Sequence, residues 1–380
     1  MDNIAGKKSS LTWAVNISAA VLVILWLVPT LGLFISSFRT GDQISSSGWW
    51  NAMFPTEQTI QLRTAPPSDQ KQEGDLWVIE GQLFDQPTTI SSWGSSSRAV
   101  SAYAPGETAD LRGGEQLTVT ENGAYRFTSP EEMSGSRGQR VFVTTTVPPE
   151  FTLENYNQIL INPQSDEGMA KAFFNTLTVT IPATIIPILV AAFAAYALAW
   201  MDFPGRALLI AAVVGLLVVP LQLALIPLLS LHNEIGIGKG YMGVWLAHTG
   251  FGMPLAIYLL RNYMAGLPRD IIENARVDGA TEFQIFVKII LPLSFPALAS
   301  FAIFQFLWTW NDLLVALVFL IDATGETTVM TRQIVELLGT RGGNWEILAT
   351  AAFVSIAVPL LVFFSMQRYL VRGLLAGSVK

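Results

Sequence analysis

Long uncharged runs, most of them apolar, alternate with short charged segments over most of this chain. A helix crosses the apolar core of a bilayer with about 20 residues, and six uncharged windows reach that length. They lie between Lys8 and Arg39, Lys171 and Asp202, Arg206 and Glu234, Lys239 and Arg261, Lys288 and Asp312, and Glu346 and Arg368. The first window is too long for the apolar region of a signal peptide, so we expect it to be retained. The pattern predicts six transmembrane helices.

A different pattern occupies residues 39–150, which form a polar, turn-rich segment after the first window. Strands are predicted at 77–79, 117–120 and 141–144, and Asn122-Gly123 is typical of a hairpin turn. We expect a small β domain of sandwich or barrel type, inserted between a first part, 1–38, and a helical part, 151–380, with five further spans. A short surface helix is expected just after Phe151.

The charge balance supports a membrane protein. Only 13% of the residues are charged, whereas a soluble domain carries about 25%. Residues 39–169 hold 17 acidic and 8 basic residues, so an acidic segment is set into a weakly basic chain, which argues against nucleic-acid binding. With the N-terminus inside, ten basic residues flank the spans on the inner side against three outside. This bias predicts cytoplasmic N- and C-termini and an extracytoplasmic β domain.

A polar island at 267–292 separates two apolar windows. Pro268 suits the start of a helix, Gly279 suits its left-handed end, and Thr281 with Gln284 has the spacing of a capping box. The island therefore reads as helix, tight turn, helix. The second helix is expected to end at Leu291, before Pro292, and to carry one apolar stripe at Phe283, Phe286, Val287 and Ile290. Acidic and basic residues are balanced over the whole island, which favours a surface that docks a protein over one that lies on lipid.

The residues of chemical interest are few. The chain has no Cys, and the spacing of His232 and His248 fits no common metal motif. The glycine-rich run at 236–241 lacks the spacing of a phosphate loop, so any ATP would be bound by another subunit. The β domain shows no catalytic constellation, which leaves a structural or docking insert.

Polar residues within the predicted spans are candidates for function or for helix packing. His248 and Gln222 favour packing. Asn311 and Asp312 interrupt an apolar run near its outer end, where an interfacial role and a pathway-lining role both remain open. Trp308 and Trp310 beside them fit an aromatic belt.

The run ENARVDGATEFQIFVKIILPLSFPAL resembles the EAA loop of type I ABC importer permeases. Residues matching at the family spacing are Glu273, Ala275, Gly279, Ile289, Leu291 and Pro292, and Asn274 departs from the pattern. The segments FNTLTVTIPATIIPILVAAFAAYALA, FLWTWNDLLVALVFL and QRYLVRGLLAGSVK resemble the carbohydrate-uptake branch, the maltose-importer type of second permease. The insert at 39–150 resembles permeases of α-glucoside importers.

This resemblance implies an all-α polytopic fold of six transmembrane helices in the bacterial cytoplasmic (inner) membrane, in contact with lipid. The implied function is that of a permease subunit, with no enzymatic activity of its own, in an ATP-driven α-glucoside importer. It would pair with a second permease, two ATPase subunits that bind ATP and Mg, and an extracytoplasmic sugar-binding protein. Alternatives are the same fold carrying another solute, such as glucosylglycerol, glycerol derivatives or oligopeptides, and a membrane-anchored sensor or enzyme.

The resemblance also assigns residues. ATPase coupling would involve the 267–292 loop through Glu273, Ala275, Asp278, Gly279, Ala280, Phe283, Phe286 and Pro292. The helix at 280–286 would lie in a cleft of the ATPase, and the tail at 373–380 would reach into the ATPase dimer. A loop that probes the binding protein would consist of Gly339, Thr340, Arg341, Gly342, Gly343, Asn344 and Trp345. The sugar site in relatives can lie mainly on the partner permease.

Overall fold

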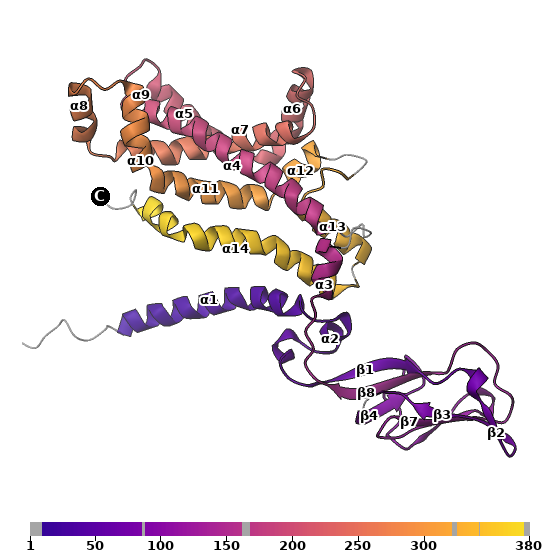
Figure 1. Cartoon of the computed structure of the whole chain (residues 1–380). Coiled ribbons are helices and arrows are strands. Elements are labelled where there is room, and N and C mark those ends of the chain that lie inside the picture. The colour runs from indigo at the N-terminus through magenta and orange to yellow at the C-terminus, as the bar shows by residue number, and fades with distance from the viewer. Residues whose placement is uncertain (1–9, 86–87, 162–167, 321–324, 342, 376–380) are drawn as a thin grey trace, which may run out of the picture. The chain divides into compact units, whose positions relative to one another are not determined.

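The computed structural model describes residues 10–85, 88–161, 168–320, 325–341 and 343–375 (Figure 1). The chain divides into two compact units. One contains Met1–Asn155 and Asn344–Thr350, and the other contains Tyr156–Gly343 and Ala351–Lys380. Each unit has its own core.

The second unit is helical. The short helical turn expected after Phe151 is present as α3 and the π-helix η4, and the remaining helices follow from α4 to α14. The first two residues of α3 and the first turns of α14, through Thr350, are counted in the first unit. Their bounds are α3 Glu154–Tyr156, η4 Asn157–Ile161, α4 Met169–Trp200, α5 Arg206–Leu216, α6 Leu221–Glu234, α7 Tyr241–Ala265, α8 Arg269–Val277, α9 Glu282–Ile285, η5 Phe286–Ile290, α10 Leu291–Leu293, α11 Phe295–Trp310, α12 Leu314–Phe319, α13 Met330–Arg341 and α14 Trp345–Leu375.

Four of the predicted windows form single helices long and apolar enough to cross a membrane: α1, α4, α7 and α14. In the Arg206–Glu234 window the expected single span is broken into two helices, and in the Lys288–Asp312 window a bend separates the end of the 267–292 island from α11. α5 and α6 meet at 109°, and the α9–α10 segment meets α11 at 70°. With 11 and 14 residues, α5 and α6 are about 17 and 21 Å long, so neither alone crosses a core of about 30 Å. Among the described residues the span count is therefore four, or six if each bent pair is one span.

Proline positions account for both breaks. Pro220 has an extended backbone (φ −67°, ψ 126°) and stands immediately before α6, where its missing N–H is not needed. Ser294 leaves the helical region at ψ 0°, and Pro296 lies in the first turn of α11. Charge-free length predicted the windows, but the local backbone at these residues decides where the chain turns.

The alanine-rich α4 lies against α7 and α11 at the centre of the helical unit (Figure 1). Ala191, Ala192 and Ala195 are fully or almost fully buried, and the small side chains allow the helices to approach closely. Between these helices, the Gln305 amide of α11 donates to the carbonyl oxygens of Ala183 (3.1 Å) and His248 (3.4 Å). This span is therefore packed within a bundle of helices.

The expected aromatic belt is wrong at Trp310. Its indole is 1% exposed, donates to the carbonyl oxygen of Ser355 at 2.9 Å and stacks on Phe306. Trp308 is partly exposed. Neighbouring tryptophans on one helix point to different sides, so only one of them can face the bilayer boundary.

The first unit joins a long helix to two β-sheets. Its elements are α1 Ser10–Ser36, α2 Gly41–Ser46, η1 Trp49–Asn51, β1 Thr56–Arg63, η2 Pro67–Asp69, β2 Lys71–Glu73, β3 Leu76–Gln82, β4 Ile90–Gly94, β5 Thr108–Asp110, η3 Arg112–Gly114, β6 Gln116–Val119, β7 Ala124–Ser129 and β8 Arg140–Val147. The described strands form one sheet in the order β1-β8-β4 and another in the order β2-β3-β7-β6-β5. All their pairings are antiparallel.

The two sheets share one apolar core, as in a sandwich. Ile79 and Phe127 of the larger sheet and Trp93 and Val143 of the smaller one belong to the same buried cluster. The predicted strands at 77–79 and 141–144 lie within β3 and β8, and the one at 117–120 extends one residue beyond the end of β6 at Val119. The predicted turn joins β6 to β7, where Gly123 has φ +84° and the Thr120 N–H donates to the carbonyl oxygen of Ala124.

Candidate functional site

The 267–292 island forms a helix, a tight turn and a second helix. α8 ends in a Schellman motif, in which the Ala280 N–H donates to the Ala275 carbonyl oxygen and the Gly279 N–H to that of Arg276, both at 3.0 Å. Gly279 has φ +80°, a conformation that costs other residues about 1–2 kcal/mol. Ala275 and Ala280, which flank the turn and are joined by the first of these bonds, are both small. The predicted left-handed role of Gly279 is confirmed.

The start of the second helix also follows the prediction. Thr281 and Gln284 form a reciprocal capping box: the Thr281 N–H donates to the Gln284 side chain at 2.9 Å, and the Gln284 N–H donates to Thr281 Oγ1 at 3.3 Å.

The predicted helix end at Leu291 is wrong, because residues 282–293 remain helical through Pro292. Leu291 is itself helical (φ −61°, ψ −48°), and its N–H donates to the carbonyl oxygen of Phe286, five residues back. The π-helical turn η5 shifts the hydrogen-bond pattern just before a residue that has no N–H to donate. A proline that ordinarily stops a helix is thereby accommodated.

The loop has a buried face and an exposed face. Ile272, Ile285, Phe286 and Ile290 pack into the core of α4 and α7, and the Phe286 ring lies 4.7 Å from that of Phe193. The predicted single stripe is therefore only partly right. Phe283 and Val287 are exposed, because the turn and η5 rotate the buried face toward Ile285 and Phe286.

The exposed face contains Glu273, Val277, Asp278, Gly279 and Phe283. Val277 is 86% exposed and Phe283 65% exposed, so two large apolar side chains are left uncovered on this face. Of the other residues assigned to coupling, Ala275 and Ala280 are half-buried, Pro292 is exposed and Phe286 is buried within this chain. Phe286 therefore contributes packing beneath the exposed face.

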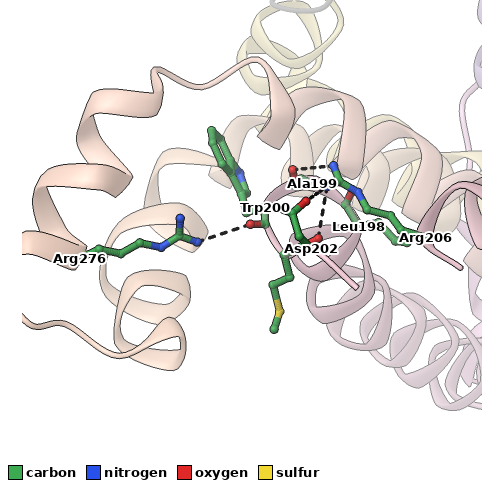
Figure 2. Close-up of polar contacts among 7 residues, drawn as sticks. Leu198, Ala199, Trp200, Asp202, Arg206 and Arg276 are labelled. Atoms are coloured by element: carbon green, nitrogen blue, oxygen red, sulfur yellow. Dashed lines mark hydrogen bonds and ion pairs between the residues drawn. The ribbon is translucent and has the colours of Figure 1, made fainter. Parts of the chain in front are cut away.

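Two arginines occupy the C-terminal end of α4 (Figure 2). Arg206 donates to the carbonyl oxygens of Leu198 (3.0 Å), Ala199 (3.1 Å) and Met201 (3.3 Å) and forms an ion pair with Asp202. Arg276 reaches the same end from α8 and donates to the carbonyl oxygen of Trp200 at 3.4 Å. The last carbonyl groups of a helix have no partner within it, and a cation there also complements the helix dipole.

Arg276 also holds the two arms of the loop together. Its Nε donates to Glu282 Oε1 at 2.9 Å, and the Tyr196 hydroxyl of α4 donates to Glu282 Oε2 at 2.5 Å. The hydrogen bond to Glu282 raises the pKa of the Arg276 guanidinium above its usual value, so the side chain stays charged. One arginine thus links α8, α9 and the end of α4.

Sequence reasoning missed Arg276, Glu282, Tyr196 and Arg206. Arg276 and Glu282 are six positions apart, a spacing at which side chains on one helix do not meet. Only the reversal of the chain at Gly279 brings them together. Tyr196 and Trp200 are about 80 positions away in the sequence.

Asn311 and Asp312, predicted as possible pathway residues, lie where α11 ends. The Asn311 amide donates to the carbonyl oxygen of Leu307 at 2.7 Å, and Asp312 Oδ2 accepts the Val315 N–H at 2.9 Å, at the start of α12. His248 Nε2 lies 3.8 Å from Asp312 Oδ2. Their contacts here are those of helix ends, and a pathway role stays a prediction.

The predicted probing loop is shorter than expected. α13 extends through Arg341, so Gly339, Thr340 and Arg341 are helical, and α14 begins at Trp345. Gly342 lies outside the described residues, as do 376–380 of the predicted tail. Gly343 and Asn344 form the described part of the connection.

The glycine-rich run before α7 serves as a turn. Ile237 and Gly238 donate their N–H groups to the carbonyl oxygen of His232, and Gly240 donates to that of Phe319. Backbone donors used in this way are not available to a phosphate. Among the described residues, no group of three His, Asp or Glu side chains is arranged to hold a metal ion.

Comparison with known proteins identifies the helical part. Residues 172–375 match the family described as "Binding-protein-dependent transport system inner membrane component". The Alpha-glucoside transport system permease protein AglG of Rhizobium meliloti is 60% identical over 379 residues, 98% of each chain.

Two other matches cover less of the chain. The Osmoprotective compounds uptake permease protein GgtD of Synechocystis is 57% identical over 231 residues, 61% of this chain and 76% of that protein. A solved chain of a bacterial ABC transporter involved in alginate import has a TM-score of 0.48 and 20% identity, and covers 59% of this chain and 81% of that one.

We predict that Arg276→Gln loosens the loop. The ion pair with Glu282 is about 42% exposed on each side and contributes little, and the Trp200 hydrogen bond adds about 1 kcal/mol. Together they stabilise the loop by about 1–2 kcal/mol, so amide exchange across 280–290 should accelerate about fivefold to thirtyfold. Hydrogen exchange with mass spectrometry on the membrane-embedded chain measures this.

Arg269→Gln, an exposed arginine of the same helix, is the matched control and should leave exchange unchanged. Equal exchange in the Arg276 variant and the native chain would contradict the prediction.

Proposed function

The chain belongs to the family of inner-membrane components of binding-protein-dependent transport systems, and we propose that it is the permease subunit of an importer for α-glucosides. The family and the long apolar helices make it a multi-pass inner-membrane protein and a subunit of an ABC importer, in which ATPase activity belongs to a separate subunit. The identity of the transported solute is what we propose.

The full-length similarity to the α-glucoside permease carries this proposal. The alignment spans 98% of both chains, so it includes the 39–150 segment as well as the helical part. The osmoprotectant permease is almost as similar over the region that it matches, so the helical part alone does not separate the two solutes. The inserted segment is what favours an α-glucoside.

Uptake of a compatible solute such as glucosylglycerol is the second candidate, supported by the 57% identity to the osmoprotectant permease. Both solutes carry several hydroxyl groups, and binding sites recognise such groups through a few placed hydrogen bonds. The described residues nominate no sugar ligand, since the partner permease is expected to hold much of that site.

We propose that the exposed face of the 267–292 loop docks on an ATPase subunit, which binds ATP and Mg. Val277 and Phe283 would provide apolar contact area, and Glu273 would pair with a basic residue of the ATPase. Closure of the ATPase pair would then move the loop. That motion would pass to the end of α4 through Arg276, Glu282 and Phe286, because Arg276 contacts Trp200 of α4 and the other two contact Tyr196 of α4.

The remaining partners follow from the same proposal. A second permease would complete the solute pathway, and an extracytoplasmic sugar-binding protein would deliver solute, with the 339–345 connection facing it. With six spans, the basic residues favour cytoplasmic N- and C-termini, so the loop would lie inside and the β-sandwich outside.

The solute is tested with the assembled importer in proteoliposomes. We expect ATP-dependent uptake of maltose, trehalose or sucrose to exceed that of glucosylglycerol severalfold, in the presence of the cognate binding protein. Preferential accumulation of glucosylglycerol would establish the second candidate instead. A nonhydrolysable ATP analogue is the control for energy coupling.

Docking is tested with Glu273→Lys and Gly279→Pro. Reversing a charge in a docked interface costs about 2–5 kcal/mol, so co-purification of the ATPase should fall roughly thirtyfold or more. Proline cannot adopt the φ of +80° found at Gly279, so it should misplace the exposed face. Both variants should insert into the membrane normally.

Lys288→Glu reverses an exposed charge on η5, away from the α8 face that carries Glu273 and Val277, and should retain the ATPase. Retention of the ATPase at native levels by the Glu273 and Gly279 variants would refute the docking role.

Orientation is tested by cysteine labelling, since the chain has no native Cys. A membrane-impermeant maleimide should label Gln72→Cys in intact spheroplasts and Arg269→Cys only after permeabilisation, because both side chains are exposed. The reverse pattern would overturn the proposed topology.

A further inference from the structure

The C-terminal end of α1 carries a compact polar junction. The buried Arg39 guanidinium donates from Nη2 to the carbonyl oxygen of Gln43 at 2.6 Å and from Nη1 to that of Ser47 at 3.1 Å. The Asn155 amide donates to the carbonyl oxygens of Ser37 (3.0 Å) and Arg39 (2.9 Å). Because these bonds satisfy the backbone where the helix stops, α2 and the returning chain are held beside α1.

The junction also places η1 next to the last turns of α1. Trp49 lies against Gly32, where an added Cβ would come within 2.8 Å of the indole Nε1. Gly32 is four residues before the end of α1, which corresponds to about 6 Å along the helix. The residues that follow Trp49 therefore lie at the level where a membrane-spanning α1 leaves the apolar core.

Three large side chains just after this contact point away from the protein. Trp50, Met53 and Phe54 are 66%, 68% and 64% exposed, whereas Ala52 between them is buried. The side chains of α1 are also exposed along most of its length. Phe151 and Leu153, on the returning chain, are exposed as well.

The charge pattern of this segment differs from that of the rest of the insert. Residues 43–56 contain no charged side chain, although 39–169 as a whole holds 17 acidic residues. Anionic headgroups repel an acidic surface, so the uncharged segment is the part of the insert suited to approach them. Tryptophan and other aromatic residues favour the boundary between headgroups and acyl chains.

We propose that Trp50, Met53 and Phe54 insert into the headgroup boundary of the bilayer and anchor the β-sandwich to the lipid surface. The occupant of this apolar face is lipid, because the face is uncharged and directly follows Trp49, which packs against the last turns of a transmembrane helix. The junction around Arg39 makes the anchor rigid, so the base of the insert is held at the bilayer. This anchoring does not depend on which solute is carried.

The absence of native Cys allows a direct test with single cysteines labelled with bimane. Met53→Cys is the test position, Trp26→Cys on the exposed surface of α1 is the lipid reference, and Gln72→Cys on β2 is the water reference. The full chain is studied within the assembled importer, in vesicles of phosphatidylcholine and phosphatidylglycerol. Two quenchers are used: aqueous iodide, and phosphatidylcholine carrying a nitroxide near the headgroup.

We expect the label at Met53 to be quenched by the nitroxide lipid severalfold more than the label at Gln72, and to be protected from iodide. Quenching by iodide equal to that at Gln72 would show a water-exposed face and overturn the proposal. Protection from both quenchers would show that a protein subunit covers the face, and would overturn it equally. The Trp26 label, protected from iodide in every case, shows that α1 has inserted into the bilayer.

Discussion

The unpaired carbonyl groups at the end of α4 impose the constraint on which the helical unit depends. A helix that emerges from a bundle leaves its last carbonyl groups without partners, and a buried end needs donors from elsewhere. Arg206 supplies donors from the next turn of chain, whereas Arg276 supplies one from a separate helix, α8. The Arg276 contact ties the loop to α4, because α8 can move only if its hydrogen bond to Trp200 breaks or if the end of α4 moves with it.

The need to pair backbone groups where a helix ends also explains other parts of the molecule. At the end of α1, Arg39 and Asn155 satisfy backbone groups and at the same time fix the point where the insert leaves and returns. Before α7, glycines with positive φ let the chain turn so that its N–H groups meet the carbonyl oxygens of His232 and Phe319. In each case the device that ends one helix also positions the next element.

The loop combines a rigid interior with an exposed apolar surface, and the two properties depend on each other. Phe286 and Ile285 fix the loop against α4 and α7, so the exposed Val277 and Phe283 are presented in one orientation. The π-helical turn before Pro292 keeps the second arm continuous up to the bend at Ser294. A loop built in this way transmits displacement instead of absorbing it, because its core is close-packed.

Local chemistry was readable from the sequence alone: the apolar windows, the Gly279 turn, the capping box of Thr281 and Gln284, and the Asn122-Gly123 hairpin each depend on a few adjacent residues. The helix bends, the continuation of the helix through Pro292, the burial of Trp310 and the exposure of Phe283 were not readable. Those features depend on which distant side chains or backbone groups lie opposite. The contacts of Arg276 with Glu282 and Trp200 are the clearest case. In the sequence Arg276 is six residues from Glu282 and 76 residues from Trp200, and the three residues meet only after the chain has turned at Gly279 and packed against α4.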